Sequence, residues 1–165
     1  MKTLYLVRHA KSSWDHPGLS DFERPLLETG IKKTGQIIDY LNKKKVIAEL
    51  IISSPAVRAL ETARLIAGGI AYPIENIKTE QAIYEAGVDD YLDVINNTPD
   101  EIASMMIFGH NPTITFVANL FLEKKIELLP TSGVVSVTFN TERWSKITEM
   151  RPSKESVVFP KMLKS

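Results

Sequence analysis

Residues 3–10 read TLYLVRHA, so an apolar run ends on the nitrogen-rich side chains of Arg8 and His9. The letters LYLV show no alternation of polar and apolar residues. This pattern favours a strand covered on both faces of a sheet over a strand with one face in water. A strand of this kind delivers its last residues to the edge of the sheet. We therefore expect Arg8 and His9 to stand at that edge.

Three further β-rich runs follow, at residues 50–53, 104–108 and 134–139. The stretches between the first three runs are each long enough for a helix, which is the pattern of repeated βαβ units. The predicted fold class is therefore α/β, a three-layer α/β/α sandwich with a mainly parallel central sheet. Residues 142–150, ERWSKITEM, are expected to form a turn and an edge strand, and the tail from residue 153 is expected to be loosely specified.

Four helices are expected around these strands. They are placed at about residues 29–44, at residues 55–67, after Val88, and from about Pro112 onward. In the first helix, Ile31, Ile38 and Leu41 fall on one face, which should be the face that packs on the sheet. In the fourth helix, Asn111 is expected to be the N-cap, followed by proline at the first helical position.

The length and charge of the chain limit the function classes. A chain of 165 residues fits a single domain, which we expect to span residues 1–165. Its 20 basic and 20 acidic residues give a formal net charge of zero, so the chain has no overall electrostatic footprint for nucleic acid or for an anionic membrane. Any anion site must come from a local cluster of charges.

The absence of cysteine removes disulfides, thiolate nucleophiles and cysteine-zinc sites together. The first apolar run is too short for the core of a signal peptide, and no segment approaches the roughly 18 apolar residues of a membrane span. The sequence therefore predicts a cytoplasmic protein that binds neither nucleic acid nor membrane.

Polar residues stand at three predicted strand ends. Arg8 and His9 follow the first strand, Arg58 lies shortly after the second, and His110 follows the third. In an open parallel sheet the carboxyl ends of the strands meet at one edge, beside the N-termini of the following helices, which favour anions. Arg58 falls in the first turn of a helix, where its charge opposes the dipole unless an anion is bound. Together the four residues predict a phosphate site.

Taken alone, a histidine at a strand end could be a structural residue that only makes hydrogen bonds within the fold. His16 lies in a polar loop and is expected to be a surface residue. With cysteine absent and no local base beside the serines, a neutral imidazole is the simplest nucleophile, which leaves His9 or His110 for that role. Two histidines could also bind a metal ion. However, no carboxylates share their turns and the arginines would repel a cation, so we expect neither a metal nor another cofactor.

These residues resemble the motifs of the histidine phosphatase superfamily, whose fold is phosphoglycerate mutase-like. The matching segments are Arg8-His9-Ala10, Ser54-Pro55, Arg58-Ala59, Thr62-Ala63 and Gly109-His110. The shortness of the chain, residues 21–26 (DFERPL), Gly109-His110-Asn111-Pro112 and Thr131-Ser132-Gly133 are most similar to the SixA-type phosphohistidine phosphatase branch.

The resemblance implies that His9 is the nucleophile and is transiently phosphorylated, without help from a metal. It implies that Arg8, Arg58 and His110 hold the phosphoryl oxygens, which agrees with the charge that develops in phosphoryl transfer. Glu85 is the position that matches the proton donor of relatives acting on esters. It could instead bind or orient a phosphohistidine, or be an ordinary solvated glutamate.

Further residues are assigned to phosphate or substrate binding: Ser12, Arg24 and Asn111. Arg24 could contact substrate, or it could pair with Asp21 to brace the loop over the site, and bracing is the preferred interpretation. Leu27 stands where relatives often place Thr or Ser before the first helix, so Thr29 is expected to replace that cap.

The sequence thus predicts a metal-independent phosphatase that works through phospho-His9 on a protein phosphohistidine. A short segment between Gly68 and Gly87 should leave the pocket open to a protein. The alternative is a phosphatase of small phosphate esters of the sugar phosphate type. A third interpretation, a phosphate-binding module without turnover, is disfavoured because both histidines are present.

Overall fold

A computed structural model describes residues 1–163 and contains a mixed six-stranded sheet. The strand order is β3-β2-β4-β1-β5-β6, and β3, β2, β4 and β1 run parallel to one another. β5 is antiparallel to β1, and β6 is antiparallel to β5. The strands are β1 Lys2–Arg8, β2 Leu50–Ser53, β3 Lys78–Thr79, β4 Ser104–Gly109, β5 Val134–Phe139 and β6 Lys154–Val158.

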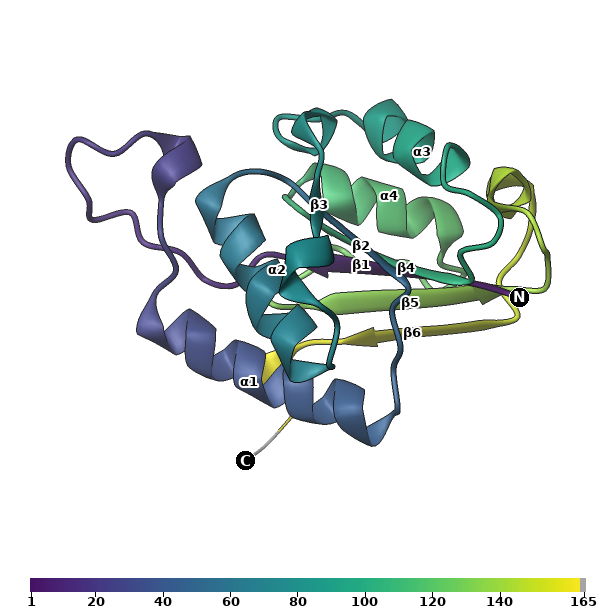
Figure 1. Cartoon of the computed structure of the whole chain (residues 1–165), viewed down its shortest axis with the longest axis horizontal. Coiled ribbons are helices and arrows are strands. Elements are labelled where there is room, and N and C mark those ends of the chain that lie inside the picture. The colour runs from purple at the N-terminus through teal and green to yellow at the C-terminus, as the bar shows by residue number, and fades with distance from the viewer. Residues whose placement is uncertain (164–165) are drawn as a thin grey trace.

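Helices cover both faces of this sheet, as Figure 1 shows. The helices are α1 Glu28–Lys43, α2 Val57–Gly69, α3 Val88–Asn96 and α4 Thr113–Phe121. α1 and α2 pack together on one face, and α3 and α4 lie on the other. The three-layer α/β/α prediction is therefore confirmed. In residues 1–163, no helix combines the length and hydropathy that a membrane crossing requires.

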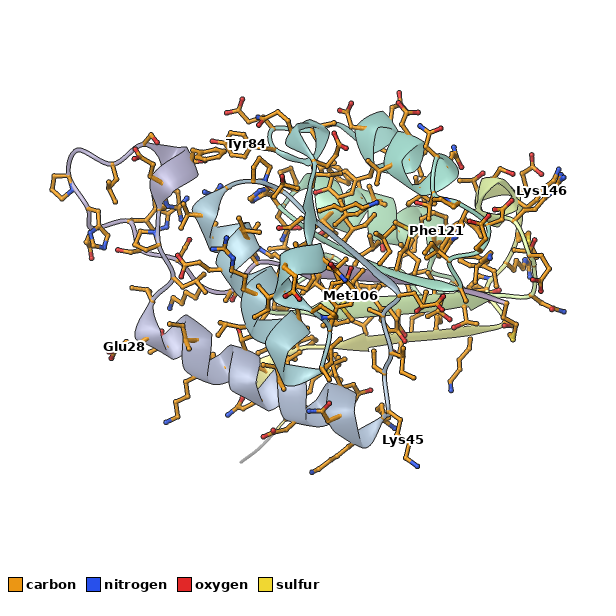
Figure 2. The ribbon with its side chains drawn as sticks, viewed as in Figure 1. Glu28, Lys45, Tyr84, Met106, Phe121 and Lys146 are labelled. Carbon is orange, nitrogen blue, oxygen red and sulfur yellow. The ribbon has the colours of Figure 1, made fainter. Side chains whose placement is uncertain are left out.

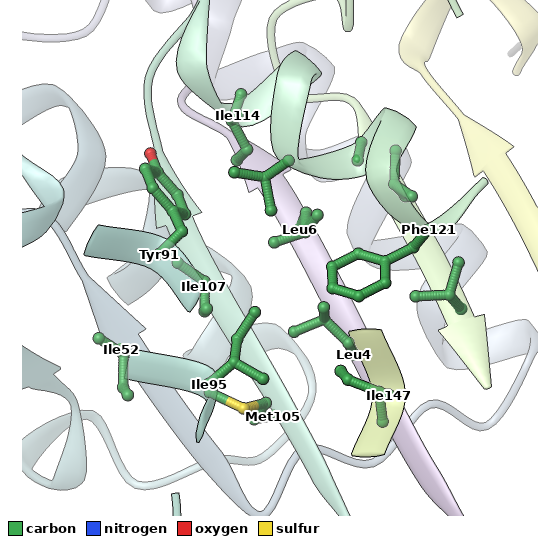
Figure 3. Close-up of a cluster of buried hydrophobic side chains, with 14 of the residues drawn as sticks. Leu4, Leu6, Ile52, Tyr91, Ile95, Met105, Ile107, Ile114, Phe121 and Ile147 are labelled. Atoms are coloured by element: carbon green, nitrogen blue, oxygen red, sulfur yellow. The ribbon is translucent and has the colours of Figure 1, made fainter. Parts of the chain in front are cut away.

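The strand sequences build a core on each side of the sheet. Leu4 and Leu6 of β1 point into a cluster with α3 and α4, drawn in Figure 3, whereas Val7 belongs to the cluster under α1 and α2. In β4, Ile107 and Phe108 divide between the two clusters in the same way. A strand that buries both faces has no polar alternation, and this explains the apolar run LYLV.

The C-terminal third departs from the sequence predictions. Residues 144–149 form 3-10 turns instead of an edge strand, and Trp144 of this segment is fully buried. The edge strand is β6, in the tail that was expected to be loosely specified. Its residues alternate between buried or half-buried and exposed, as an edge strand with one wet face requires, and it pairs with β5 from Val134 to Thr138.

Helix ends also differ from the predictions. α1 has Leu27 at its N-cap with no side-chain hydrogen bond, so Thr29 does not cap it. The Leu27 amide instead donates to the Lys11 carbonyl at 2.9 Å. Ile31 is 43% exposed, because the buried face of α1 is centred on Ile37 and Leu41. α4 starts at Thr113, and its N-cap is Pro112 rather than Asn111.

Gly30 allows α1 to approach the chain that leaves β1. A methyl group on Gly30 would overlap the backbone carbonyl of Lys11 and lie 2.9 Å from its amide nitrogen. Backbone atoms cannot move aside as a flexible side chain can. Gly35, in the same helix, has open space around the corresponding position.

We expect Gly30→Ala to destabilise the fold by more than about 1 kcal/mol, because the Lys11 backbone must shift. Gly35→Ala should stabilise it by about 0.5–1 kcal/mol through helix propensity. Urea unfolding of both variants measures the two effects. Equal free energies of unfolding for the two variants would contradict the close packing of α1 on Lys11.

Candidate active site

The strand register places the predicted residues at one edge of the sheet. Arg8 pairs with Gly109 and Ser53 with Phe108, so the residues that follow β1, β2 and β4 emerge side by side. β5 starts at the same edge because it is antiparallel to β1. A cavity of about 620 Å³ opens there. Seven of its lining residues were singled out from the sequence: Arg8, His9, Ser12, Arg24, Arg58, His110 and Asn111.

His9 lies in this cavity with only 7% of its surface exposed. Its Nδ1 is 2.7 Å from the Ala10 carbonyl oxygen. A carbonyl can only accept, so Nδ1 carries the proton and the lone pair is on Nε2. Burial and the smaller effects of the charges of His110, Arg58 and Arg8 together lower the pKa of His9 to about 3, against the hydrogen bond to Ala10. His9 is therefore a neutral imidazole near pH 7.

Hydrogen bonds to the protein fix the guanidinium groups of Arg8 and Arg58. Nη1 of Arg8 donates to the Leu129 carbonyl at 3.1 Å. Arg58 donates from Nη1 to the Asp21 carbonyl at 2.6 Å and from Nη2 to the Asp21 carboxylate at 3.0 Å. The Nε atoms of both arginines are buried and have no hydrogen-bond partner. Each guanidinium is thus anchored while one strong donor stays free.

His110 is oriented by Ser54. Nε2 of His110 is 2.7 Å from the Ser54 hydroxyl, which also accepts a hydrogen bond from the Ala56 amide at 3.2 Å. A hydroxyl that accepts from the amide can donate to Nε2, and this places the ring proton on Nδ1. Burial, together with the charge of Arg58, lowers the pKa of His110 to about 4. The sequence motif includes Ser54 but does not indicate this contact with His110.

Three unpartnered nitrogens therefore share the cavity. Among residues 1–163, the buried side-chain nitrogen or oxygen atoms without a partner are Nε of Arg8, Nε of Arg58 and Nδ1 of His110. A buried donor left unbonded costs about 1–3 kcal/mol. The ring centroids of His9 and His110 are 5.3 Å apart. An anion is the kind of partner that such donors lack.

The loop after β1 is braced by Arg24. Its Nε donates to the Ser13 carbonyl at 2.9 Å, and its Nη atoms donate to Asp21 at 2.9 Å and to the Ser12 hydroxyl at 2.6 Å. Its guanidinium also stacks 3.4 Å over the Trp14 ring. These contacts support the bracing interpretation of Arg24. Ser12 also uses its hydroxyl within the loop, and the substrate contacts of both residues stay predictions.

Asn111 spans two segments beside the cavity. Its Nδ2 donates to the Leu129 carbonyl at 2.8 Å, and its Oδ1 accepts from the Thr115 hydroxyl at 2.6 Å. The same Leu129 carbonyl anchors Arg8. Asn111 therefore helps to fix the segment that holds Arg8, and direct binding of substrate by Asn111 stays a prediction.

Asp21 and Tyr84 were not predicted to belong to the site itself. The Asp21 carboxylate accepts from Arg24, from Arg58 and from the Tyr84 hydroxyl, the last at 2.9 Å. Tyr84 also packs edge-on against the His110 ring, with centroids 5.8 Å apart. Figure 2 shows Tyr84 facing the 3-10 turn Asp21–Glu23. Asp21 had been considered as a partner of Arg24, but its link to Arg58 depends on the tertiary fold.

Glu85 is not brought into the cavity. It is exposed and is not among the cavity-lining residues. Its φ angle of 54° marks a left-handed turn, after which the chain enters α3. The side chain that this loop contributes to the site is Tyr84 instead. The role of Glu85 as proton donor stays a prediction, and the geometry does not favour it.

Residues 1–163 contain no group of three or more His, Asp or Glu placed to hold a metal ion. The cavity is lined by two histidines, three arginines and Lys11, against two aspartates. This donor set suits an anion better than a cation.

A comparison with protein-family models matches residues 4–102 to the histidine phosphatase superfamily (branch 1). The matched range holds Arg8, His9 and Arg58 and covers more than half of the chain. The chain belongs to the histidine phosphatase superfamily. Membership supports a phosphatase and agrees with the arginines and histidines that line the cavity.

Relatives of this superfamily member include SixA proteins. Phosphohistidine phosphatase SixA of Escherichia coli K12 is 26% identical over 141 residues, 83% of this chain and 85% of that protein. A candidate SixA phosphohistidine phosphatase from Agrobacterium tumefaciens is 30% identical, covers 82% of this chain and 90% of its own, and has a TM-score of 0.75. The tungstate complex of the protein histidine phosphatase SixA shares the fold, with a TM-score of 0.80 and 23% identity. The match covers 98% of this chain and 99% of that chain.

The buried neutral state of His9 predicts a pH-dependent stability. The folded pKa of about 3 lies below the unfolded value of 6.5, so the unfolded chain binds the proton first as pH falls. Below pH 6.5 the free energy of unfolding should drop because of His9, by about 2 kcal/mol between pH 7.5 and 5.

His9→Asn removes this contribution. Urea unfolding in buffers without phosphate should show the wild type losing about 2 kcal/mol relative to His9→Asn between pH 7.5 and 5. A difference between the two proteins that does not change with pH would show that His9 is not buried in the neutral state.

Proposed function

We propose that this protein is a phosphatase in which Nε2 of His9 attacks phosphorus and forms a phosphohistidine intermediate. The observation that carries the proposal is the set of three buried, unpartnered donors around a neutral imidazole. A structural histidine pair would be expected to satisfy its own hydrogen bonds. A phosphoryl group supplies acceptors for all three donors at once.

The proposed reaction has two displacements at phosphorus. The Nε2 lone pair of His9 forms a nitrogen–phosphorus bond, and the bond from phosphorus to the leaving group breaks with its electrons. Water then attacks phospho-His9, and the nitrogen–phosphorus bond breaks to return its electrons to Nε2 and release phosphate. The Nδ1 hydrogen bond to Ala10 keeps the same tautomer ready for each cycle.

The three donors would stabilise the charge that spreads over the phosphoryl oxygens. Arg8 and Arg58 supply full positive charges from fixed positions, because Nη1 of Arg8 and both Nη atoms of Arg58 are bonded to the protein. His110 supplies a neutral N–H whose tautomer Ser54 sets. Donors that are already in place need no reorganisation during the reaction, which is the usual source of electrostatic catalysis.

We propose protein phosphohistidine as the substrate. The SixA relatives support this substrate. The position of Glu85, the predicted proton donor, also supports it. An ester leaves as an alkoxide and needs a proton, yet the predicted donor Glu85 does not line the cavity. An imidazole leaving group can bring its own proton. A small phosphate ester is the second candidate substrate, and the expected cytoplasmic location stays a prediction.

Trapping the phosphoenzyme tests the nucleophile. The wild type, incubated with a labelled phosphohistidine peptide and quenched in base, should carry acid-labile phosphate on His9. His9→Asn should carry none and lose turnover by at least about 10³-fold, because no other side chain presents a free nucleophilic nitrogen there. The matched control is His16→Asn, an exposed histidine outside the cavity, which should label like the wild type. Label on another residue would refute the proposed mechanism.

Chelation tests the expectation of a metal-independent reaction. Turnover of the phosphohistidine peptide should be unchanged after dialysis against EDTA, because the proposed charge stabilisation comes from Arg8 and Arg58. Loss of activity that returns with one divalent ion would show that the reaction depends on a metal.

A further inference from the structure

The Asp21 carboxylate lines the cavity and accepts three side-chain hydrogen bonds. Oδ1 accepts from Nη1 of Arg24, and Oδ2 accepts from Nη2 of Arg58 and from the Tyr84 hydroxyl. These partners come from the loop after β1, from α2 and from the segment before α3. Three independent elements thus fix one carboxylate beside the phosphate donors.

The charged groups that face Asp21 keep it ionised. Burial raises the pKa of Asp21, but the hydrogen bonds from Arg24, Tyr84 and Arg58 outweigh it and lower the pKa to about 2. His110 also faces this carboxylate, which acts to raise the His110 pKa against the stronger effects of burial and Arg58. Glu23, in the same 3-10 turn, directs its carboxylate to Ser20 instead.

Asp21 lies between the phosphate donors and the mouth of the cavity. Its side chain is 49% exposed, whereas only 7% of the surface of His9 is exposed. In an in-line displacement the leaving group departs on the side opposite the nucleophile. Because His9 attacks from the buried end, the leaving group must face the open end, where the half-exposed Asp21 has one lone pair of Oδ1 left unbonded.

We propose that Asp21 is a specificity-determining residue that accepts a hydrogen bond from the protonated ring nitrogen of a departing imidazole. This inference rests on the proposed function. It explains why the open end of the cavity holds an ionised carboxylate and not a proton donor. The site then selects phosphohistidine over phosphate esters by the charge of the leaving group.

The proton and electron balance is simple for this substrate. The ring of the phosphohistidine carries phosphorus on one nitrogen and a proton on the other, so it is cationic. As His9 bonds to phosphorus, the electrons of the old nitrogen–phosphorus bond return to the ring. The product is a neutral imidazole that keeps its proton, so no general acid is required.

Asp21 favours this route in two ways. A carboxylate beside the ring raises the pKa of its second nitrogen and keeps the reactive, protonated form populated above neutral pH. For an ester, the leaving oxygen gains negative charge as the bond breaks. The same carboxylate then repels the leaving group and has no proton to supply.

Asp21→Asn separates this role from the anchoring of Arg58. The measurement is the ratio of kcat for a phosphohistidine peptide to kcat for p-nitrophenyl phosphate, taken from pH 6 to 8.5, because kcat reports the protonation of the bound substrate. Weaker anchoring of Arg58 reduces both values and cancels in the ratio. We expect the ratio to fall about tenfold at pH 8.5 and to change little at pH 6, since one unit of substrate pKa is tenfold in the protonated fraction.

Two further variants complete the design. Asp21→Glu keeps the charge and should retain most of the wild-type ratio at pH 8.5. Glu23→Gln removes a charge from the same turn, outside the cavity-lining residues, and should leave the ratio unchanged. A ratio that Asp21→Asn leaves unchanged at every pH would overturn the inference and reduce Asp21 to a support for Arg58. Absence of phospho-His9 in the wild type would instead refute the proposed function.

Discussion

The site depends on three buried nitrogen donors that the protein itself leaves unbonded, next to an imidazole kept neutral by burial. Two guanidinium groups and a histidine cannot be brought together without repulsion and loss of hydration. Hydrogen bonds hold the arginines in place: Nη1 of Arg8 donates to the Leu129 carbonyl, and both Nη atoms of Arg58 donate to Asp21. The nitrogens that remain without a partner are Nε of each arginine and Nδ1 of His110, and a phosphoryl group can accept hydrogen bonds from such donors.

The rest of the fold places these site residues next to one another. The parallel register of β1, β4 and β2 brings the chain after each strand to one point, and the antiparallel β5 returns to the same edge. Gly30 lets α1 pack against Lys11, so that the loop after His9 turns back over the cavity. Within that loop Arg24 ties Ser12, Ser13 and Asp21 together and stacks on Trp14. The loop is therefore an ordered wall of the site.

The central strands and the positions of the histidines and arginines could be predicted from the sequence. An apolar run indicates a buried strand, and the polar residues at its end indicate where that strand reaches the edge of the sheet. β6 was missed because an edge strand buries only one face and its alternating residues look like a polar tail. The predicted Thr29 cap was wrong because α1 begins at Glu28, which places Thr29 inside the helix, and the Lys11 carbonyl accepts from the Leu27 amide at the N-cap.

Other features of the site could not be read from the chain at all. Asp21 meets Arg58, which is 37 residues away, and Ser54 meets His110, which is 56 residues away. Both contacts depend on how the strands and loops assemble. Glu85 follows Tyr84 directly and adopts a left-handed turn, and it is Tyr84 that contacts Asp21 and the His110 ring.

The most direct test of the account is a crystal structure of the protein with tungstate bound. Oxygens of the anion should lie about 2.7–3.1 Å from Nε of Arg8, Nε of Arg58 and Nδ1 of His110, with the metal centre facing Nε2 of His9. An anion bound elsewhere, or one that leaves these three donors without partners, would contradict the phosphoryl site described for this protein.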